Sequence, residues 1–495
     1  MKIRINCCKI FDVILLPKKE TIMIDTGNYR ELRAFAAYFD EISRVPRVSG
    51  ITDHIAKYLT DFAKAHGLEY YRDASDNVII KKPSTAGRKT GPTVILQGHT
   101  DMVPAGSPEG IARLKTEGVK IIQDGDIIRA DGTTLGADNG VAVAYMLAIL
   151  ESEDISHPAL ECVFTSNEET GLNGAADIEA KLLSGRIMIN LDAGGDGLFV
   201  AGCAGGLRAN VSMPVRREAA SGSCYKIAVS GFLGGHSGCD IDKCRENAIK
   251  ALADCLYELG EVRIADFSGG SASNAIPARA EATVICDKTA SEIGEMIAPV
   301  FEKYKKAEPE GRISVDTAFF GELALDADST DKLLSLIHRQ PTGIVAMSED
   351  IEGLVETSRN VGTARLTDSS FELVVSIRSP LEESRLAVLS EVEAIGAVFN
   401  ATVTSDGDYP GWAYRKVSHL RDTCCESHKE LFGSSPTVVT IHAGLECGLF
   451  SSKLEGLDCI SMGPDTYEVH TVNEWFSLRS AQRFWKLLIK VLEKI

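Results

Sequence analysis

The stretch Ser166-Asn167-Glu168-Glu169-Thr170-Gly171 joins two adjacent carboxylates to the end of an apolar run. The run, Cys162-Val163-Phe164-Thr165, predicts a buried strand, and the glycine allows the turn that ends it. Adjacent side chains on an extended chain point in opposite directions, so one carboxylate could face a metal ion and the other a water beside it. An isolated Glu-Glu pair is more often two solvated loop residues, so the interpretation depends on the other strand ends.

Two further apolar runs end in residue types that bind metals. Thr93–Asp101 predicts a strand that ends in His99-Thr100-Asp101, and Arg186–Asp192 predicts one that ends in a carboxylate. Residues two apart on a strand face the same side, so Asp101 can accept the second ring N–H of His99 and fix its tautomer. An ordinary strand-end histidine remains the alternative for His99 taken alone.

Asp138 stands just before an apolar helix predicted at Val141–Leu150. It is either the N-cap of that helix or a carboxylate that bridges two metal ions, with one oxygen on each. Predicted strands alternate with this helix and with a second one at Ala175–Leu183, which indicates a mostly parallel α/β sheet flanked by helices. Ligands of such sheets gather at the carboxyl ends of the strands, where His99, both glutamates and Asp192 fall. A set of histidine and carboxylates suits zinc, with manganese or cobalt as substitutes.

Length, charge and cysteine content exclude other classes of protein. The chain has 495 residues, enough for two or three domains, and 44% of them are apolar, as in ordinary globular proteins. Its 52 basic and 70 acidic residues give a formal charge of −18, which argues against a nucleic-acid partner. No apolar run approaches the roughly 18 residues that predict a membrane span. Thirteen cysteines without paired CxxC spacing indicate reduced thiols and a cytoplasmic protein.

The sequence predicts a catalytic domain with a second domain inserted into it. Residues 1–22 are expected to be a disordered extension ahead of the first helix, or translation from an upstream start codon. Residues 23–206 and 408–495 are assigned to the catalytic domain, and residues 207–407 to an inserted α+β lid domain. The order of strands and helices in the inserted domain suggests a duplicated unit. Residues 106–131 predict a long loop with a small hairpin.

Six short motifs, in order along the chain, resemble those of the aminoacyl-histidine dipeptidase family, whose members are also called peptidase D or cytosol non-specific dipeptidase. The motifs are Gly98-His99-Thr100-Asp101-Met102-Val103-Pro104, Leu135-Gly136-Ala137-Asp138-Asn139-Gly140, Ser166-Asn167-Glu168-Glu169-Thr170-Gly171, Asn190-Leu191-Asp192, Gly234-Gly235-His236-Ser237-Gly238 and His442-Ala443-Gly444-Leu445-Glu446-Cys447-Gly448. The family belongs to the di-zinc superfamily of carboxypeptidase G, aminoacylase and carnosinase. The resemblance spans about residues 23–495, and the motifs are specific in combination, although Glu-Glu-Thr-Gly alone is not.

The resemblance implies that Asp138 bridges two zinc ions. One ion would also bind His99 and Asp192, and the other would also bind Glu169 and His470. Of these ligands, His470 has the least distinctive local sequence, although a histidine shortly after a Gly-Pro pair fits the family. In this superfamily the peptide bond that follows the bridging aspartate is often cis.

The same resemblance implies how the reaction would proceed and on what. Glu168 would be the general base, Asp101 would orient His99, and His236 would reach the substrate carbonyl from the same chain or from a partner chain. The positions that resemble substrate-binding residues are Arg378, Asn274, His442, Gly444 and Glu446.

The activity implied by this resemblance is metal-dependent hydrolysis of dipeptides, Xaa-His and others, by a homodimer that associates through the lid domain. Hydrolysis of N-acyl amino acids by the same metals is the alternative activity. A non-catalytic binding protein on this scaffold is disfavoured, because every expected ligand and base position is filled.

Overall fold

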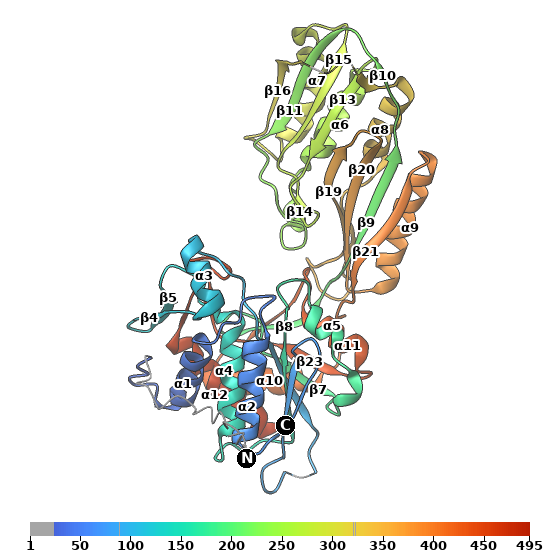
Figure 1. Cartoon of the computed structure of the whole chain (residues 1–495). Coiled ribbons are helices and arrows are strands. Elements are labelled where there is room, and N and C mark those ends of the chain that lie inside the picture. Colours follow the sequence, from blue (N-terminus) through green and yellow to red (C-terminus); the bar gives the residue numbers. More distant parts are fainter. Residues whose placement is uncertain (1–23, 89, 320, 322) are drawn as a thin grey trace, which may run out of the picture.

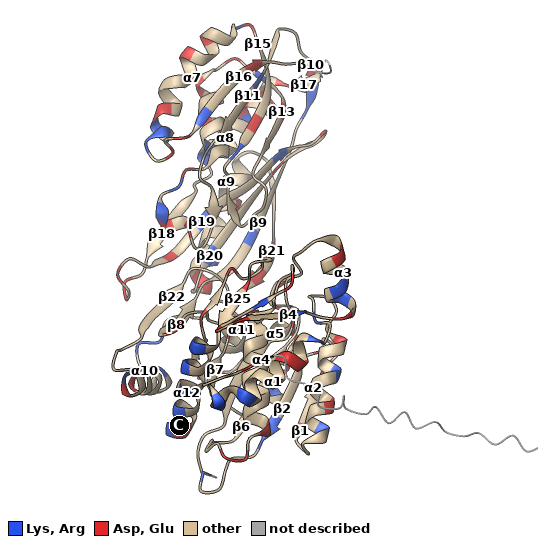
Figure 2. Cartoon of the chain, turned by 90° about the vertical axis from the view of Figure 1, so that its left-hand side faces the viewer, with Lys and Arg blue, Asp and Glu red and all other residues tan. Residues whose placement is uncertain are grey.

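A computed structural model describes residues 24–88, 90–319, 321 and 323–495 of the chain. The extension predicted at residues 1–22 lies outside the described residues. The described chain folds into two large sheets with their helices, which stand one above the other in an elongated molecule (Figure 1). Figure 2, turned by 90°, shows the same arrangement, with Lys and Arg interspersed among Asp and Glu in both parts.

The first sheet has a parallel centre. Its strands lie in the order β1 (Glu69–Arg72), β2 (Val78–Lys82), β6 (Leu160–Thr165), β3 (Val94–His99), β7 (Ile187–Asn190), β23 (Asp458–Ser461), β8 (Leu198–Cys203) and β22 (Thr437–Ile441). The neighbours from β6 to β23 pair in parallel, and so do β8 and β22. The pairs β1–β2, β2–β6 and β23–β8 are antiparallel. The predicted α/β class with a mostly parallel sheet is therefore confirmed, with antiparallel additions toward both edges.

Helices cover both faces of this sheet, because successive strand side chains alternate between two cores. Leu96 joins one hydrophobic cluster and its neighbour Ile95 joins the other. The larger cluster receives α1 (Arg33–Ser43), α2 (Asp53–Ala65), α4 (Ala137–Glu151), α10 (His419–Phe432) and α12 (Leu478–Lys494). The smaller cluster receives α5 (Asn173–Asp177) and α11 (Glu446–Lys453).

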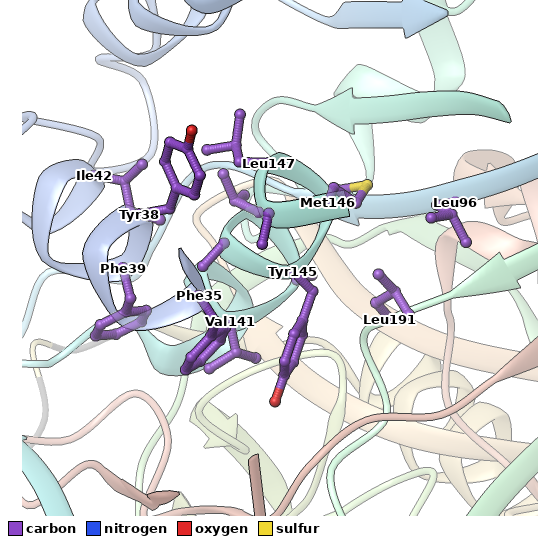
Figure 3. Close-up of a cluster of buried hydrophobic side chains, with 14 of the residues drawn as sticks. Phe35, Tyr38, Phe39, Ile42, Leu96, Val141, Tyr145, Met146, Leu147 and Leu191 are labelled. Carbon is purple, nitrogen blue, oxygen red and sulfur yellow. The ribbon is translucent and has the colours of Figure 1, made fainter. Parts of the chain in front are cut away.

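Helix α4 is apolar on all sides because it lies between the sheet and the outer helices. Figure 3 shows its Tyr145 and Val141 facing Phe35 of α1. The rings of Phe35 and Tyr145 stack with centroids 4.4 Å apart, and the Tyr145 hydroxyl donates to the carbonyl of Ala481 in α12, 2.9 Å away. The helix that begins beside Asp138 is thus anchored in the larger hydrophobic cluster.

Two local predictions for this region were wrong. The predicted loop of residues 106–131 contains helix α3 (Pro108–Thr116), which Ser107 caps by accepting the N–H of Gly110, before the predicted hairpin of β4 (Ile121–Asp124) and β5 (Ile127–Ala130). This hairpin continues into a small sheet with β25 (Trp475–Ser477) and β24 (Thr466–Tyr467).

The helix predicted at Ala175–Leu183 is the second error. It is divided into α5 and the 3₁₀ turn η2 (Ala180–Leu182). The ammonium group of Lys453 donates to the carbonyls of Ala175, Ala176 and Ile178. These carbonyls are thereby satisfied without a further helical turn, so the helix ends early.

The second sheet is antiparallel throughout its described pairings. Its strands lie in the order β16 (Arg312–Thr317), β11 (Ser223–Ser230), β15 (Ala280–Cys286), β13 (Arg263–Gly269), β19 (Val355–Leu366), β20 (Ser370–Ser379), β9 (Gly205–Pro214) and β21 (Thr402–Tyr409), and β18 (Gly343–Met347) also pairs with β19. The helices of its core are α6 (Ala248–Glu258), α7 (Ala290–Lys305), α8 (Ala327–Arg339) and α9 (Glu382–Val398).

The second sheet consists of two halves. Strands β16, β11, β15 and β13 pack with α6 and α7, whereas β19, β20, β9 and β21 pack with α9. The halves meet through a short pairing of β13 with β19, at Ser268–Arg365 and Gly269–Ala364. A two-stranded ribbon of β12 (Gly235–His236) and β14 (Ala275–Ile276) extends from the first half toward the first sheet (Figure 1). The remaining short elements are η1 (Arg30–Leu32), η3 (Ile241–Lys243) and the β10 (Arg217–Ala219) and β17 (Leu323–Leu325) pair.

Candidate active site

Three neighbouring parallel strands end at one edge of the first sheet, and each contributes candidate ligands there. Strand β3 lies between β6 and β7, so His99 at its end has the Glu168-Glu169 loop on one side and Asp192 on the other. Asp138 approaches from the start of α4. The structure therefore brings together side chains that are far apart in the sequence, as the pattern of strand ends predicted.

His99, Asp138 and Asp192 form the first group of candidate ligands. The Nε2 atom of His99 lies 2.9 Å from Asp138 Oδ1 and 3.4 Å from Asp192 Oδ1. The imidazole of His99 is fully buried, and its Nδ1 lies 3.0 Å from the backbone carbonyl of Asp101. A neutral ring that donates its Nδ1 proton to this carbonyl presents Nε2 as an electron-pair donor toward the carboxylates.

The second group consists of His470, Glu169 and the other oxygen of Asp138. His470 lies in the loop between β24 and β25, with Nε2 3.2 Å from Asp138 Oδ2 and 2.8 Å from Glu169 Oε1. Although burial opposes the shift, the two histidines lower the pKa of the Asp138 carboxyl. The two Asp138 oxygens thus face two different histidines. The peptide bond between Asp138 and Asn139 is cis.

The donor atoms of both groups suit divalent cations. Within the described residues, the buried Oε1 atom of Glu169 has no hydrogen-bond partner, although the His470 ring nitrogen lies close to it. A ring nitrogen and a carboxylate oxygen 2.8 Å apart are close enough to be ligands of a common cation. The atoms of each group lie within 4.8 Å of one another, and nitrogen with carboxylate oxygen is the donor chemistry of zinc.

Glu168 stands beside these groups on a loop fixed by Asp101. The Asp101 carboxylate accepts the backbone N–H of Glu168 at 2.9 Å and that of Glu169 at 3.4 Å, and it also accepts the hydroxyl proton of Ser49. Burial raises the pKa of the Glu168 carboxyl, His99 opposes the rise, and nearby carboxylates add to it. A carboxylate that binds protons more strongly than usual is suited to accept one.

The position of Asp101 differs in one respect from the sequence prediction. Its carboxylate oxygen lies 3.5 Å from His99 Nδ1, farther than its own backbone carbonyl, which takes the ring hydrogen bond. The carboxylate is directed instead at the Glu168-Glu169 backbone. The two-residue spacing in the sequence correctly predicted that Asp101 lies next to the His99 ring. It did not predict that the backbone carbonyl of Asp101, and not its carboxylate, accepts the ring N–H.

His236 lies on the ribbon of the second sheet, away from the two ligand groups. Its Nδ1 accepts the backbone N–H groups of Gly238 and Cys239, 3.2 and 3.1 Å away, so the neutral ring carries its proton on Nε2. Burial, and after it the cation of Arg378, lowers the pKa of His236. Asn274 is exposed, and its backbone carbonyl accepts the N–H of Ser237.

Arg378 and His442 lie where the two sheets approach each other. Arg378, buried at the end of β20, donates to the hydroxyl of Tyr409 at 3.1 Å. His442, just after β22, shares a 2.7 Å hydrogen bond with Ser358 of β19, and burial, Arg378 and His236 lower its pKa to about 4. The sequence did not predict that Tyr409 and Ser358 hydrogen-bond Arg378 and His442, because a single hydroxyl residue in a strand has no distinctive local pattern.

Tyr409 also explains the glycine at position 444. A Cβ atom on Gly444 would lie 2.7 Å from the Tyr409 ring, so this position admits only glycine if the ring is to stay against the backbone. Among the described residues, no hydrogen bond or ion pair joins the set of His236, Arg378 and His442 to the two candidate ligand groups. The site residues therefore fall into two separate sets.

Glu446 does not occupy the substrate-facing place predicted for it. It is fully buried below the strand ends, where its carboxylate accepts from Gln97 Nε2 at 2.5 Å and from Thr165 Oγ1 at 2.8 Å. Asn190 donates in turn to Gln97 at 2.6 Å. This network ties together β3, β6 and β7 under the ligands. The only sign of this network in the sequence was Gln97, a polar residue inside the apolar run of β3.

A cavity of about 260 Å³ opens beside the first ligand group. Asp138 and Asp192 lie on one side of it, and its apolar walls include Val141, Leu191 and Pro464. A small molecule bound there would contact both carboxylates. In the part of the chain that the structure describes, no helix is both long and apolar enough to cross a bilayer.

Comparison with known proteins agrees with this geometry. Residues 95–494 match the family described as peptidase family M20/M25/M40. The cytosol non-specific dipeptidase of Escherichia coli (strain K12) is 34% identical over 467 residues, which cover 92% of this chain and 96% of that protein. The crystal structure of aminoacylhistidine dipeptidase from Vibrio alginolyticus matches with a TM-score of 0.85 at 31% identity, over 93% of this chain and 96% of that one.

A more distant relative shares the fold alone. Aminopeptidase PepT from Bacillus cereus matches with a TM-score of 0.56 at 17% identity, over 95% of this chain and 99% of that one. The family resemblance inferred from the six sequence motifs is confirmed by the match over most of the chain. The chain therefore belongs to peptidase family M20/M25/M40 and is a peptide hydrolase.

Proposed function

We propose that this protein is a dipeptidase that uses two divalent ions, acts on Xaa-His and other dipeptides, and works in the cytoplasm. The observation that carries the proposal is the pair of histidine and carboxylate groups that share Asp138, with Glu168 beside them. The printed names of the two relatives that match nearly the whole chain, a cytosol non-specific dipeptidase and an aminoacylhistidine dipeptidase, support the same activity.

The two ligand groups would each hold one ion. His99 and Asp192 would bind the first, Glu169 and His470 the second, and Asp138 would bind both through its separate oxygens. Zinc is the preferred metal, and manganese or cobalt could replace it. When bound, such ions lower the pKa of a coordinated water and polarise a carbonyl group.

The protein's own groups would move the proton and stabilise the charge that develops. Glu168 would accept a proton from the attacking water and deliver it to the leaving amine nitrogen. The Nε2–H of His236 would donate to the carbonyl oxygen as it becomes negative, since its Nδ1 is already occupied by two backbone donors. The Arg378 guanidinium, whose Nε has no partner among the described residues, would pair with the substrate carboxylate.

A substrate panel separates a dipeptidase from an N-acyl amino acid hydrolase. The wild-type protein, loaded in turn with zinc, manganese and cobalt, is assayed with carnosine, other Xaa-His dipeptides, unrelated dipeptides and N-acetylated amino acids. We expect kcat/KM for free dipeptides to exceed that for the N-acetylated compounds by at least about tenfold, equivalent to 1.4 kcal/mol in the transition state. Faster hydrolysis of the N-acetylated compounds would refute the dipeptidase assignment.

We also propose that His236 serves the active site of its own chain. A Cβ atom on Gly238 would lie only 2.3 Å from the carbonyl oxygen of His442, so the His236 loop is packed against the catalytic half of the same chain. Asn360 Nδ2 anchors the partner strand of the ribbon by donating to Ala275 O at 2.8 Å. These contacts support action within one chain, because they join the His236 ribbon to His442 and to β19 of the same chain.

Complementation between two inactive variants tests this assignment. Two differently tagged chains, His236→Ala and Glu168→Gln, are co-expressed, and the heterodimer is purified through both tags. This design rests on a further proposal, a homodimer formed through the lid domain, where Ile344, Val345 and Met347 of the edge strand β18 are exposed. If His236 acts within its own chain, the heterodimer stays inactive. Action across subunits would restore one of its two sites and about half of the wild-type activity. A monomer by light scattering with full activity would also support action within one chain.

A further inference from the structure

Arg47 is a buried cation that hydrogen-bonds the backbone close to two candidate ligands, His99 and Asp138. It is 1% exposed and is among the largest fully buried side chains. Its Nη1 donates to the backbone carbonyl of Thr100 at 3.0 Å, and its Nη2 donates to that of Gly136 at 2.6 Å. Thr100 follows His99 directly, and Gly136 stands two residues before Asp138. One planar guanidinium thus connects the end of strand β3, which carries His99, to the start of helix α4, which carries Asp138.

Two glycines of the Leu135–Gly140 motif make room for this guanidinium. A Cβ atom on Gly136 would lie 2.5 Å from Arg47 Nη2, and a Cβ on Gly140 would lie at the same distance. Gly136 also has φ of +67°, a left-handed conformation that disfavours other residues. The spacing of four residues between these glycines is therefore explained by the buried cation and requires no contact with substrate.

Glu474 holds the same segment from the opposite side. It is 2% exposed, and its carboxylate accepts the N–H groups of Leu135 at 2.8 Å, Gly136 at 2.9 Å and Asp138 at 3.1 Å. The Gly136 residue is thus bound at its N–H by Glu474 and at its carbonyl by Arg47. Glu474 lies in the His470 loop, four residues further along the chain, so it also joins that loop to the Asp138 segment.

The charge of Arg47 is compatible with its burial. Burial lowers the pKa of Arg47 to about 10, and Glu474, Asp101 and Asp138 oppose that fall, so the guanidinium stays charged at neutral pH. An unpaired charge in the same place would be strongly destabilising. Arg47 therefore adds a cation near Asp101 and Asp138, and together with Glu474 it fixes the backbone of the Asp138 segment.

We propose that Arg47 and Glu474 are positioning residues that set the separation between His99, Asp138 and His470, and thereby the geometry of the metal centre. The inference rests on the proposed two-metal function. Lysine cannot replace arginine in this role, because a compact ammonium group lacks the two parallel N–H donors that reach both carbonyls at once. The role differs from general stabilisation of the fold, which would leave metal affinity and turnover unchanged.

The test compares Arg47→Lys with the matched variant Arg421→Lys. Arg421 is also buried, and its Nη1 and Nη2 also donate to two backbone carbonyls, those of Arg415 and Lys416, but it lies on α10 away from the ligands. For each variant, zinc affinity is measured by competition with a chelating dye, the melting temperature of the metal-free protein is recorded, and kcat and KM are determined.

We expect Arg47→Lys to weaken zinc binding by about 10–100-fold, the range typical for the loss of a group that orients a metal ligand. Turnover should fall by at least tenfold, and KM should change by less than threefold. Arg421→Lys should lower the melting temperature only. If Arg47→Lys lowers only the melting temperature, as Arg421→Lys does, the positioning role is refuted. The proposal of a metal centre is not affected by that result.

If Arg47→Lys does not fold, Glu474→Gln tests the positioning role in its place. The amide keeps the size of the side chain but presents one acceptor in place of two, so zinc affinity should again fall by at least tenfold. Unchanged affinity in a folded Glu474→Gln protein would overturn the proposal. Failure of the wild-type protein to bind zinc, manganese or cobalt would overturn the proposed function together with this inference.

Discussion

Glu168→Gln should reduce kcat by about 10²–10⁴-fold, the usual contribution of a general acid-base group, while the bound zinc stays at the wild-type level. The side chain has ligand atoms within 4.8 Å of those of His99 and Glu169, but it belongs to neither of the two groups that share Asp138. Its backbone N–H is held by Asp101. Exchange of the carboxylate for an amide therefore removes the proton acceptor without loosening the loop. The measurements are kcat and the zinc content after dialysis.

The neighbouring glutamate supplies the control for this experiment. Glu169→Gln removes the charge of a side chain whose oxygen lies 2.8 Å from His470 Nε2, so this variant should lose zinc as well as turnover. Comparison of the two variants tests whether Glu168 is the base and Glu169 is a metal ligand. Wild-type activity in Glu168→Gln would refute its role as the base, and loss of zinc from it would make Glu168 a ligand.

Asp138→Asn should have the larger effect on metal binding. The two oxygens of Asp138 lie 2.9 Å from His99 Nε2 and 3.2 Å from His470 Nε2, so both ion positions depend on one carboxylate. An amide offers a single oxygen and no charge. We expect zinc affinity to fall by more than the roughly 10–100-fold seen when only a ligand's hydrogen-bond partner is lost. Activity should disappear with the metal.

Metal analysis and thermal unfolding with and without zinc measure this effect. A ligand that binds only the folded state raises its stability by about 2.7 kcal/mol at 100 times its Kd, so added zinc should raise the melting temperature of the wild-type protein and not that of Asp138→Asn. His99→Ala, which disturbs one group, should retain a smaller response. Two tightly bound ions in Asp138→Asn would exclude the bridging role.

The strand ends could be predicted from the sequence because the relevant signals are local. The runs that end in His99, Glu168 and Asp192 are apolar and short, and the rule that parallel strands gather ligands at their carboxyl ends places them together without any distance information. Which glutamate serves as base and which as ligand came from the family resemblance. The structure adds the geometry, with Asp138 Oδ1 beside His99 and Oδ2 beside His470.

The contacts that the sequence did not reveal join residues far apart in the chain. Glu474 and the segment at Leu135 are separated by more than three hundred positions, and nothing in the local sequence of either indicates the contact. Glu446 illustrates the opposite error, since a family motif suggested substrate contact for a side chain that is wholly buried. The end of α5 was misplaced for a similar reason, because a lysine from α11 determines it.

The position of β23 between β7 and β8 has a consequence for synthesis of the protein on the ribosome. This strand and His470 are made only after the whole second sheet has emerged, and α12, which covers α4, comes later still. Domains generally fold as they leave the ribosome, so the inserted sheet can form while the first sheet still has unpaired strand edges. A chain that stops before His470 therefore lacks one of the proposed metal ligands, so we expect it not to hydrolyse peptides.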